Sequence, residues 1–169
     1  MARKTPTGSG IDRLPATHWK HVRDVRCPGR PGDRIDHVLV GPSGVYVIGY
    51  VASDGVAITS DTAGGHAAGA WSVAGLLPER YQSKIRPALC FRGDEPVADL
   101  VDEVMVASSS TLAHILRSSP VVLSTSEVAK VWKLLDSRLE PFPLPQVRSR
   151  RWVAWLQMFT VLRGRSRAV

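Results

Sequence analysis

Two apolar runs in the first third of the chain predict the centre of the fold. Ile35 to Val40 and Val45 to Val51 are rich in valine and isoleucine, and the turn-forming residues Gly41 to Gly44 separate them. This pattern predicts two strands joined by a tight turn. Before them, apolar and polar residues alternate over His18 to Arg26, which indicates a third strand. Because both central runs are apolar on each face, we expect a sheet that is covered on both sides.

Helical spacing and further apolar runs predict the remaining elements. Helices are expected at about His66 to Gln82, at Thr111 to Arg117 and at Ser126 to Leu139. Pro78 either kinks the first of these helices or opens a second turn. Further strands are expected at Ile85 to Phe91 and at Glu103 to Ala107, with a short one at Val56 to Ile58. The predicted fold is a mixed α/β (α+β) domain, a central β-sheet flanked by helices.

Turn-forming segments set the predicted domain boundaries. Residues 1–17 are rich in Gly, Pro, Thr and Ser and are expected to form a flexible leader. Residues 52–65 are small and turn-rich. The proline-rich stretch Glu140 to Pro145 is expected to end the domain. This leaves residues 18–140 as one folded domain and 141–169 as a Pro-rich linker with a tail.

The short turn fixes which residues of the central hairpin face one another. If its two middle residues occupy the turn centre, Val40 faces Val45 and Asp36 faces Gly49. Side chains alternate along a strand, so Asp36 then projects from the same face as the valines of both strands. A lone carboxylate in that setting is either solvated or capping at the start of its strand, or it has a chemical role.

Several segments resemble the nuclease-related domain family, known as NERD. The family hallmark is IDH, then GPSGVFVI, then acid-x-Lys, and this chain has RIDHVLVGPSGVYVI (Arg34 to Ile48) after DVRCPG (Asp24 to Gly29). LLPERYQSKIRPALCF (Leu76 to Phe91) and PVVLSTSEVAKVWKLL (Pro120 to Leu135) are similar to the later part of actinobacterial members. The resemblance covers about residues 18–139.

The resemblance implies a restriction-endonuclease-like core, as in the PD-(D/E)XK nucleases. There, acidic side chains on neighbouring strands hold Mg²⁺ and a lysine lies beside them. Magnesium prefers oxygen ligands, and the metal polarises the phosphodiester and activates a water molecule. Matched residue by residue, Asp36 falls at the first metal carboxylate, Gly49 at the second carboxylate position and Val51 at the lysine position.

Two of these matched positions cannot perform that chemistry. Glycine has no side chain, and valine has neither charge nor hydrogen-bonding capacity. The N-terminal helix that usually carries a further glutamate in the family is not evident either. Asp33 and Asp54 are alternative oxygen ligands, although turn chemistry explains both. The resemblance therefore predicts a catalytically inactive domain with no cofactor, and Mg²⁺ bound at Asp36 if the domain is active.

The positive charge of the chain is concentrated behind the predicted domain. The net charge is +7, and residues 141–169 carry six of the 22 basic residues and none of the 15 acidic ones. Apolar residues at helical spacing between two groups of arginines predict a helix at about 150 to 163. Its candidate binding residues are Arg148, Arg150, Arg151, Trp152, Trp155, Arg163, Arg165 and Arg167.

Four roles are open to this basic, amphipathic tail. It packs back on the domain, lies on an anionic membrane surface, contacts a protein partner or contacts nucleic acid. No run reaches the roughly 18 apolar residues of a membrane span, and no secretion signal is evident. Cys27 and Cys90 lack the spacing of a metal site or a disulfide framework and are expected to be reduced and buried. We expect a cytoplasmic protein, peripheral at the membrane if the tail binds lipid.

The sequence thus predicts a non-catalytic interaction or nucleic-acid-associated module on a nuclease-like scaffold. One alternative is an active metal-dependent DNA nuclease with a relocated site. The other is a protein held at a membrane surface by its tail. A second acidic side chain that converges on Asp36 would favour the nuclease alternative.

Overall fold

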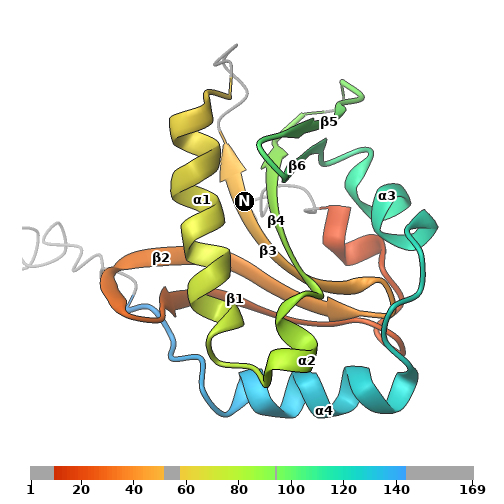
Figure 1. Ribbon diagram of the computed structural model, residues 1–169. Coiled ribbons are helices and arrows are strands. Elements are labelled where there is room, and N and C mark those ends of the chain that lie inside the picture. The colour runs from red at the N-terminus through yellow and green to blue at the C-terminus, as the bar shows by residue number, and fades with distance from the viewer. Residues whose placement is uncertain (1–9, 52–57, 94, 144–169) are drawn as a thin grey trace, which may run out of the picture.

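The computed structural model describes residues 10–51, 58–93 and 95–143, which form a six-stranded sheet with helices packed against it (Figure 1). The strands are β1 (Lys20–Cys27), β2 (Arg30–Gly41), β3 (Gly44–Val51), β4 (Ile85–Phe91), β5 (Ala98–Val101) and β6 (Val104–Ser108). The helices are the 3₁₀ helix η1 (Gly10–Arg13), α1 (Ser60–Ala74), α2 (Glu79–Gln82), α3 (Leu112–Ser118) and α4 (Thr125–Asp136). The predicted class, a mixed sheet flanked by helices, is confirmed.

The sheet has the strand order β1-β2-β3-β4-β6-β5. β1, β2 and β3 form an antiparallel meander. α1 then leads to β4, which is parallel to β3, and β6 is parallel to β4. β5 pairs with β6 in the antiparallel sense at one edge. At the other edge Pro141 bridges to Val25, so the end of the described chain runs beside β1.

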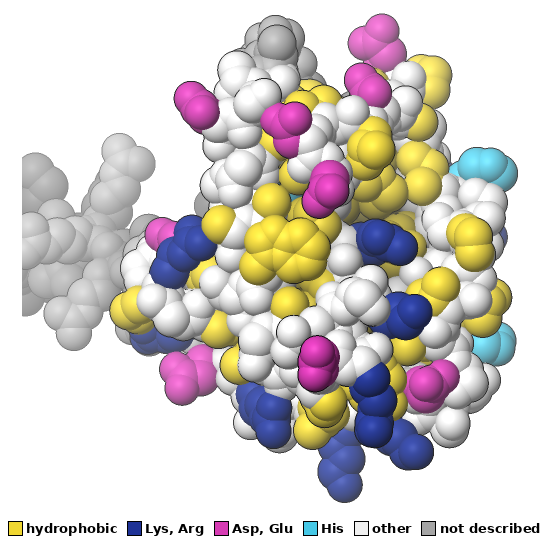
Figure 2. All heavy atoms as spheres, in the orientation of Figure 1, with side chains coloured by type: hydrophobic (Ala, Val, Ile, Leu, Met, Phe, Trp, Pro, Cys, Tyr) yellow, Lys and Arg dark blue, Asp and Glu magenta, His cyan; other side chains and the backbone are white. Residues whose placement is uncertain are grey.

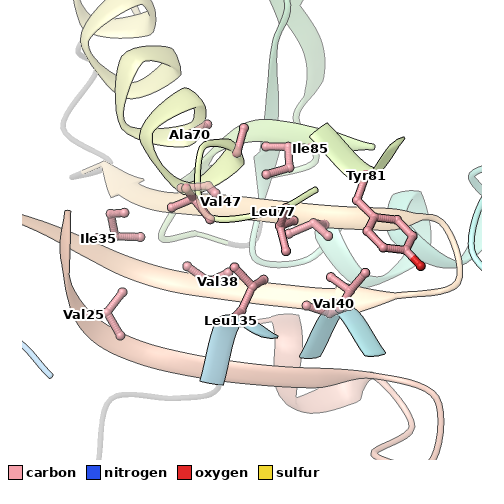
Figure 3. Close-up of a cluster of buried hydrophobic side chains, with 14 of the residues drawn as sticks. Val25, Ile35, Val38, Val40, Val47, Ala70, Leu77, Tyr81, Ile85 and Leu135 are labelled. Carbon is pink, nitrogen blue, oxygen red and sulfur yellow. The ribbon is translucent and has the colours of Figure 1, made fainter. Parts of the chain in front are cut away.

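Apolar side chains cover both faces of this sheet. On one face, α1, α2 and α4 complete the α1-side core, in which strand valines meet helix residues (Figure 3). Its labelled members are Val25, Ile35, Val38, Val40, Val47, Ala70, Leu77, Tyr81, Ile85 and Leu135. On the other face, η1 and α3 pack over Leu39, Tyr46 and Ile48 and complete the α3-side core. Burial on both faces explains why neither central strand has a polar side in the sequence.

The predicted register of the central hairpin is confirmed. The paired residues are Gly41 with Gly44, Val40 with Val45, Leu39 with Tyr46, Val38 with Val47 and His37 with Ile48. The ladder between the two strands ends at His37 and Ile48, and one further step in the same register places Asp36 opposite Gly49. Asp36 and Gly49 therefore lie at the same end of the hairpin.

The helix ends follow local capping chemistry, with one boundary predicted wrongly. α1 begins at Ser60, about six residues before the predicted start, and the side chain of Thr59 caps it. The expectation of turns up to residue 65 is therefore wrong for its last part. Pro78 opens α2 as a separate short helix. Ser124 caps α4 and forms a capping box with Glu127.

Other expectations need correction or lie beyond the described residues. The leader is not entirely flexible, because Ile11 and Leu14 are buried around η1. β5 was not predicted, and β2 begins at Arg30, five residues before the predicted start at Ile35. Of the expected short strand at 56–58, only Ile58 is described, and it is not in a strand. The tail, residues 144–169, lies outside the described residues.

Candidate functional site

A cavity of about 610 Å³ lies at the open end of the β2–β3 hairpin, between the sheet and α1. The three positions matched to nuclease chemistry all line it: Asp36 from β2, with Gly49 and Val51 from β3. From α1, Gly65 and His66 contribute to the wall. The structure thus brings the sequence-matched positions together in one cavity, and the helix adds a histidine.

Both carboxylate oxygens of Asp36 are already engaged by protein donors. Arg34 donates a hydrogen bond from Nη2 to Oδ1 at 2.8 Å, and the backbone N–H of Tyr50 donates to Oδ2 at 2.8 Å. The Asp36 side chain is 21% exposed, so these charge-assisted bonds are partly shielded from water. Asp36 therefore ties β2 to β3 where their ladder ends.

The arginine that holds Asp36 is itself positioned by Asp24. Arg34 Nη1 lies 3.4 Å from Asp24 Oδ1. Asp24 has a left-handed backbone conformation with φ of 53°, which aspartate tolerates better than most residues. The alternation of β1 breaks here, because Val22 and Val25 both pack against the α1-side core although they are three residues apart. The left-handed backbone of β1 at Asp24 and the engagement of Asp36 are therefore linked through the Arg34 guanidinium.

His66 fills the space that a side chain at Gly49 would need. A Cβ atom at Gly49 would lie 2.9 Å from Cε1 and Nδ1 of the His66 ring. The ring is held by its Nε2, 2.9 Å from the carbonyl oxygen of Val47, and this nitrogen donates because a carbonyl only accepts. Burial lowers the pKa of His66, so the imidazole is mainly neutral at pH 7. The position of the second carboxylate is thus both empty of a side chain and covered.

Sequence reasoning did not identify His66 as part of this site. The residue has no partner at metal-ligand spacing, and the predicted helix was expected only to begin there. Its position over Gly49 arises because α1 crosses the face of β3, where His66 reaches the Val47 carbonyl. This position results from tertiary packing, which the spacing of residues along the sequence does not reveal.

Val51, which the resemblance matches to the lysine, belongs to an apolar cluster. It packs against the buried side chains of Ala63, Leu89 and Val104. Ionising a lysine among these groups would require desolvation without a compensating partner from this cluster. The packing at this end of β3 therefore suits valine better than lysine.

The alternative oxygen ligands do not complete a metal site in the described residues. Asp33 lies on β2 and pairs with Arg30 at 3.7 Å. Asp54 belongs to residues 52–57, which lie outside the described ranges. Across residues 10–51, 58–93 and 95–143, no group of three or more His, Cys, Asp or Glu side chains is arranged to hold a metal ion.

His37 and the two cysteines are buried, as the sequence predicts for the cysteines. His37 lies on the sheet face opposite Asp36, only 7% exposed, with its ring centroid 5.3 Å from that of Tyr50. Cys27 and Cys90 are free and buried. Burial raises the pKa of the Cys90 thiol to about 11, which leaves it protonated at neutral pH.

The charge of the folded body is close to balanced. Residues 1–140 carry 16 basic and 15 acidic residues, and the face in Figure 2 shows both kinds of side chain along its lower edge. The predicted binding residues of the tail, from Arg148 to Arg167, are not among the described residues, so their role stays a prediction. None of the helices in the described part has the length and apolar character needed to cross a bilayer.

No family model matches this chain, and no curated protein or solved structure is significantly similar to it.

Proposed function

We propose that this chain is a nuclease-related, NERD-like module with a restriction-endonuclease-like core that no longer hydrolyses phosphodiesters and acts through binding. One observation carries the proposal. The carboxylate at the first metal position, Asp36, is bound by Arg34 and by the Tyr50 amide, while the second position, Gly49, lies beneath His66. The remnant of the catalytic site has thus been converted into a structural contact.

The chemical requirement explains why this arrangement is unsuited to catalysis. A magnesium-dependent nuclease needs carboxylates that converge on the ion and leave room for water and a phosphate oxygen. Here one carboxylate remains, and its oxygens already accept hydrogen bonds. The neutral imidazole of His66 is a weaker match for magnesium than an oxygen ligand. The place of the lysine cation is taken by the apolar side chain of Val51.

Two structural features support a nuclease-like scaffold behind this lost chemistry. The acid position is on β2 and the other two matched positions are on β3, so they lie on adjacent antiparallel strands. All three line one cavity beside α1. In the nuclease core that the resemblance implies, the acidic and basic groups around the metal likewise lie on neighbouring strands and face one shared site.

DNA cleavage tests the proposal directly. The purified full chain, incubated with supercoiled plasmid and Mg²⁺ or Mn²⁺, is expected to leave the plasmid supercoiled. Asp36→Ala, purified in parallel, is expected to give the same result and controls for contaminating nuclease. Metal-dependent nicking by the natural chain that is absent from Asp36→Ala would overturn the proposal and establish the active-nuclease alternative.

A further inference from the structure

The sheet face opposite the cavity carries a row of basic and aromatic side chains. We call His21, Arg23, His37, Tyr50 and Arg92 the His–Arg strip; its members come from β1, β2, β3 and the residue after β4. The Arg92 guanidinium lies 5.1 Å from the Tyr50 ring centroid, which is 5.3 Å from that of His37. The His37 and His21 ring centroids are 6.1 Å apart. The strip therefore crosses four adjacent strands without a gap.

The arginines of this strip differ from those around the cavity. At the cavity end of the meander, Arg26, Arg30 and Arg34 each lie within 4.0 Å of an acidic oxygen. No ion pair between described residues includes Arg23 or Arg92, and both side chains are exposed. Arg23 and Arg92 are thus without a carboxylate partner among the described residues, whereas each of the three arginines at the cavity end has one.

Burial and neighbouring positive charges both lower the pKa values of the two histidines. Burial is the main cause that lowers the pKa of His37 to about 4, and the charges of Arg23 and His21 lower it further. The pKa of His21 is lowered by burial and by Arg23. Nearby carboxylates oppose these effects only in part: Asp24 and Asp36 act on His37, and Asp12 acts on His21.

His37 also has an unmet hydrogen-bonding group. Its side chain is 7% exposed, and its Nδ1 has no hydrogen-bond partner among the described residues. A buried polar atom without a partner costs roughly 1–3 kcal/mol, so such atoms are uncommon unless they serve a purpose. An anion seated beside the ring would add an acceptor and would favour the protonated imidazole.

We propose that the His–Arg strip binds a phosphate oxyanion, with the phosphate of a nucleotide as its natural source. This proposal rests on the proposed function, because it names the surface through which a non-catalytic module would contact nucleic acid. Guanidinium groups suit phosphate because they offer several N–H donors in a planar arrangement. The Arg92–Tyr50 pair adds a flat surface against which a base can stack.

Arg23 and Arg92 stand at opposite ends of the strip. Arg23 is on the first strand of the row and Arg92 follows the fourth, so their backbones are about three strand spacings apart across the sheet, or roughly 14 Å. In the paired register Arg23 is level with Ala88, so Arg92 also lies four residues further along the strands, roughly 13 Å. Each guanidinium therefore approaches the His37–Tyr50 pair from its own side. The proposed ligand thus lies on the sheet face away from Asp36.

Histidine NMR signals of the full chain provide the test. The chain has five histidines and none in residues 144–169, so the imidazole signals do not report contacts of the basic tail. Inorganic phosphate, adenosine monophosphate and adenosine are titrated separately at pH 7. We expect saturable shifts of His21 and His37 with the first two and none with adenosine. Tighter binding of the nucleotide than of phosphate would assign the base-stacking role to Arg92 and Tyr50, and equal binding would assign recognition to the oxyanion alone.

Matched variants make this test decisive. Arg23→Gln and Arg92→Gln are each expected to weaken phosphate binding at least about fivefold, whereas Arg80→Gln, an exposed arginine on α2, should leave it unchanged. Absence of saturable shifts in the natural chain, or equal shifts in the Arg23→Gln/Arg92→Gln double variant, would overturn the proposal. Neither result would restore DNA cleavage, so a failure here is distinguishable from a failure of the proposed function.

Discussion

Replacing Gly49 with alanine is expected to lower the free energy of unfolding by about 1–3 kcal/mol, as overpacking in a filled site does. The new Cβ atom would lie 2.9 Å from the His66 ring and 3.3 Å from Cδ2 of Leu89. The ring cannot move away without weakening its hydrogen bond to Val47. Urea unfolding followed by circular dichroism measures the effect.

Gly65 provides the matched control, because it lines the same cavity and is also replaced by alanine. A Cβ atom at Gly65 would have no neighbour within 4 Å, and the residue lies inside α1. Gly65→Ala is therefore expected to stabilise the protein by about 0.5–1 kcal/mol through helix propensity. A neutral or stabilising Gly49→Ala would show that His66 does not occupy the second carboxylate position.

The stability of the protein is expected to fall by up to about 3 kcal/mol between pH 6.5 and pH 4 through His37 alone. Burial holds the pKa of His37 at about 4 in the folded protein, whereas its ordinary value is 6.5. The unfolded chain therefore takes up a proton first as the pH falls. The stabilising contribution is complete above about pH 6.5 and is lost on the way down to pH 4.

His37→Phe isolates this contribution, since it keeps an aromatic ring beside Tyr50 and removes the titration. The difference in unfolding free energy between pH 7 and pH 4.5 should be smaller in this variant than in the natural chain. His114→Gln, at an exposed position on α3, should leave the difference unchanged. An identical pH dependence in His37→Phe and the natural chain would mean that His37 is not desolvated in the fold.

The central hairpin could be predicted from the sequence in detail because two independent constraints agree there. A four-residue Gly-Pro-Ser-Gly turn fixes the register, and apolar residues on both faces place the strands in the middle of a sheet. The same reasoning gave β4 with its correct bounds. Register then placed Asp36 opposite Gly49, which is where the structure has the open end of the hairpin.

Elements that depend on tertiary contacts were missed. The start of α1 contains Gly64 and Gly65, which local propensity disfavours in a helix, yet the helix is anchored by its Thr59 cap and by the burial of Ala63. β5 is exposed at three of its four residues, so it has no apolar pattern to reveal it, and its pairing with β6 defines it. Ile11 is buried although its neighbours in sequence indicate a loop.

The candidate site, too, could be predicted only in part from the sequence. The sequence indicated that two of the matched positions cannot be catalytic, because residue identity alone shows that glycine and valine cannot bind metal or supply a cation. It did not indicate which side chains surround these positions. The bonds from Arg34 and Tyr50 to Asp36, and the cover of Gly49 by His66, join residues whose proximity follows only from the completed sheet and helix packing.

The unfolding free energy of Asp36→Asn, measured with and without Mg²⁺, distinguishes a structural Asp36 from a metal-binding one. Asparagine keeps the size of the side chain but removes its negative charge. That charge holds Arg34 and strengthens the hydrogen bond from the Tyr50 N–H. We predict a loss of about 1–2 kcal/mol, with no stabilisation of the natural chain by millimolar Mg²⁺. A metal-binding carboxylate would give the reverse: Asp36→Asn as stable as the natural chain or more so, and stabilisation by Mg²⁺ that disappears in the variant.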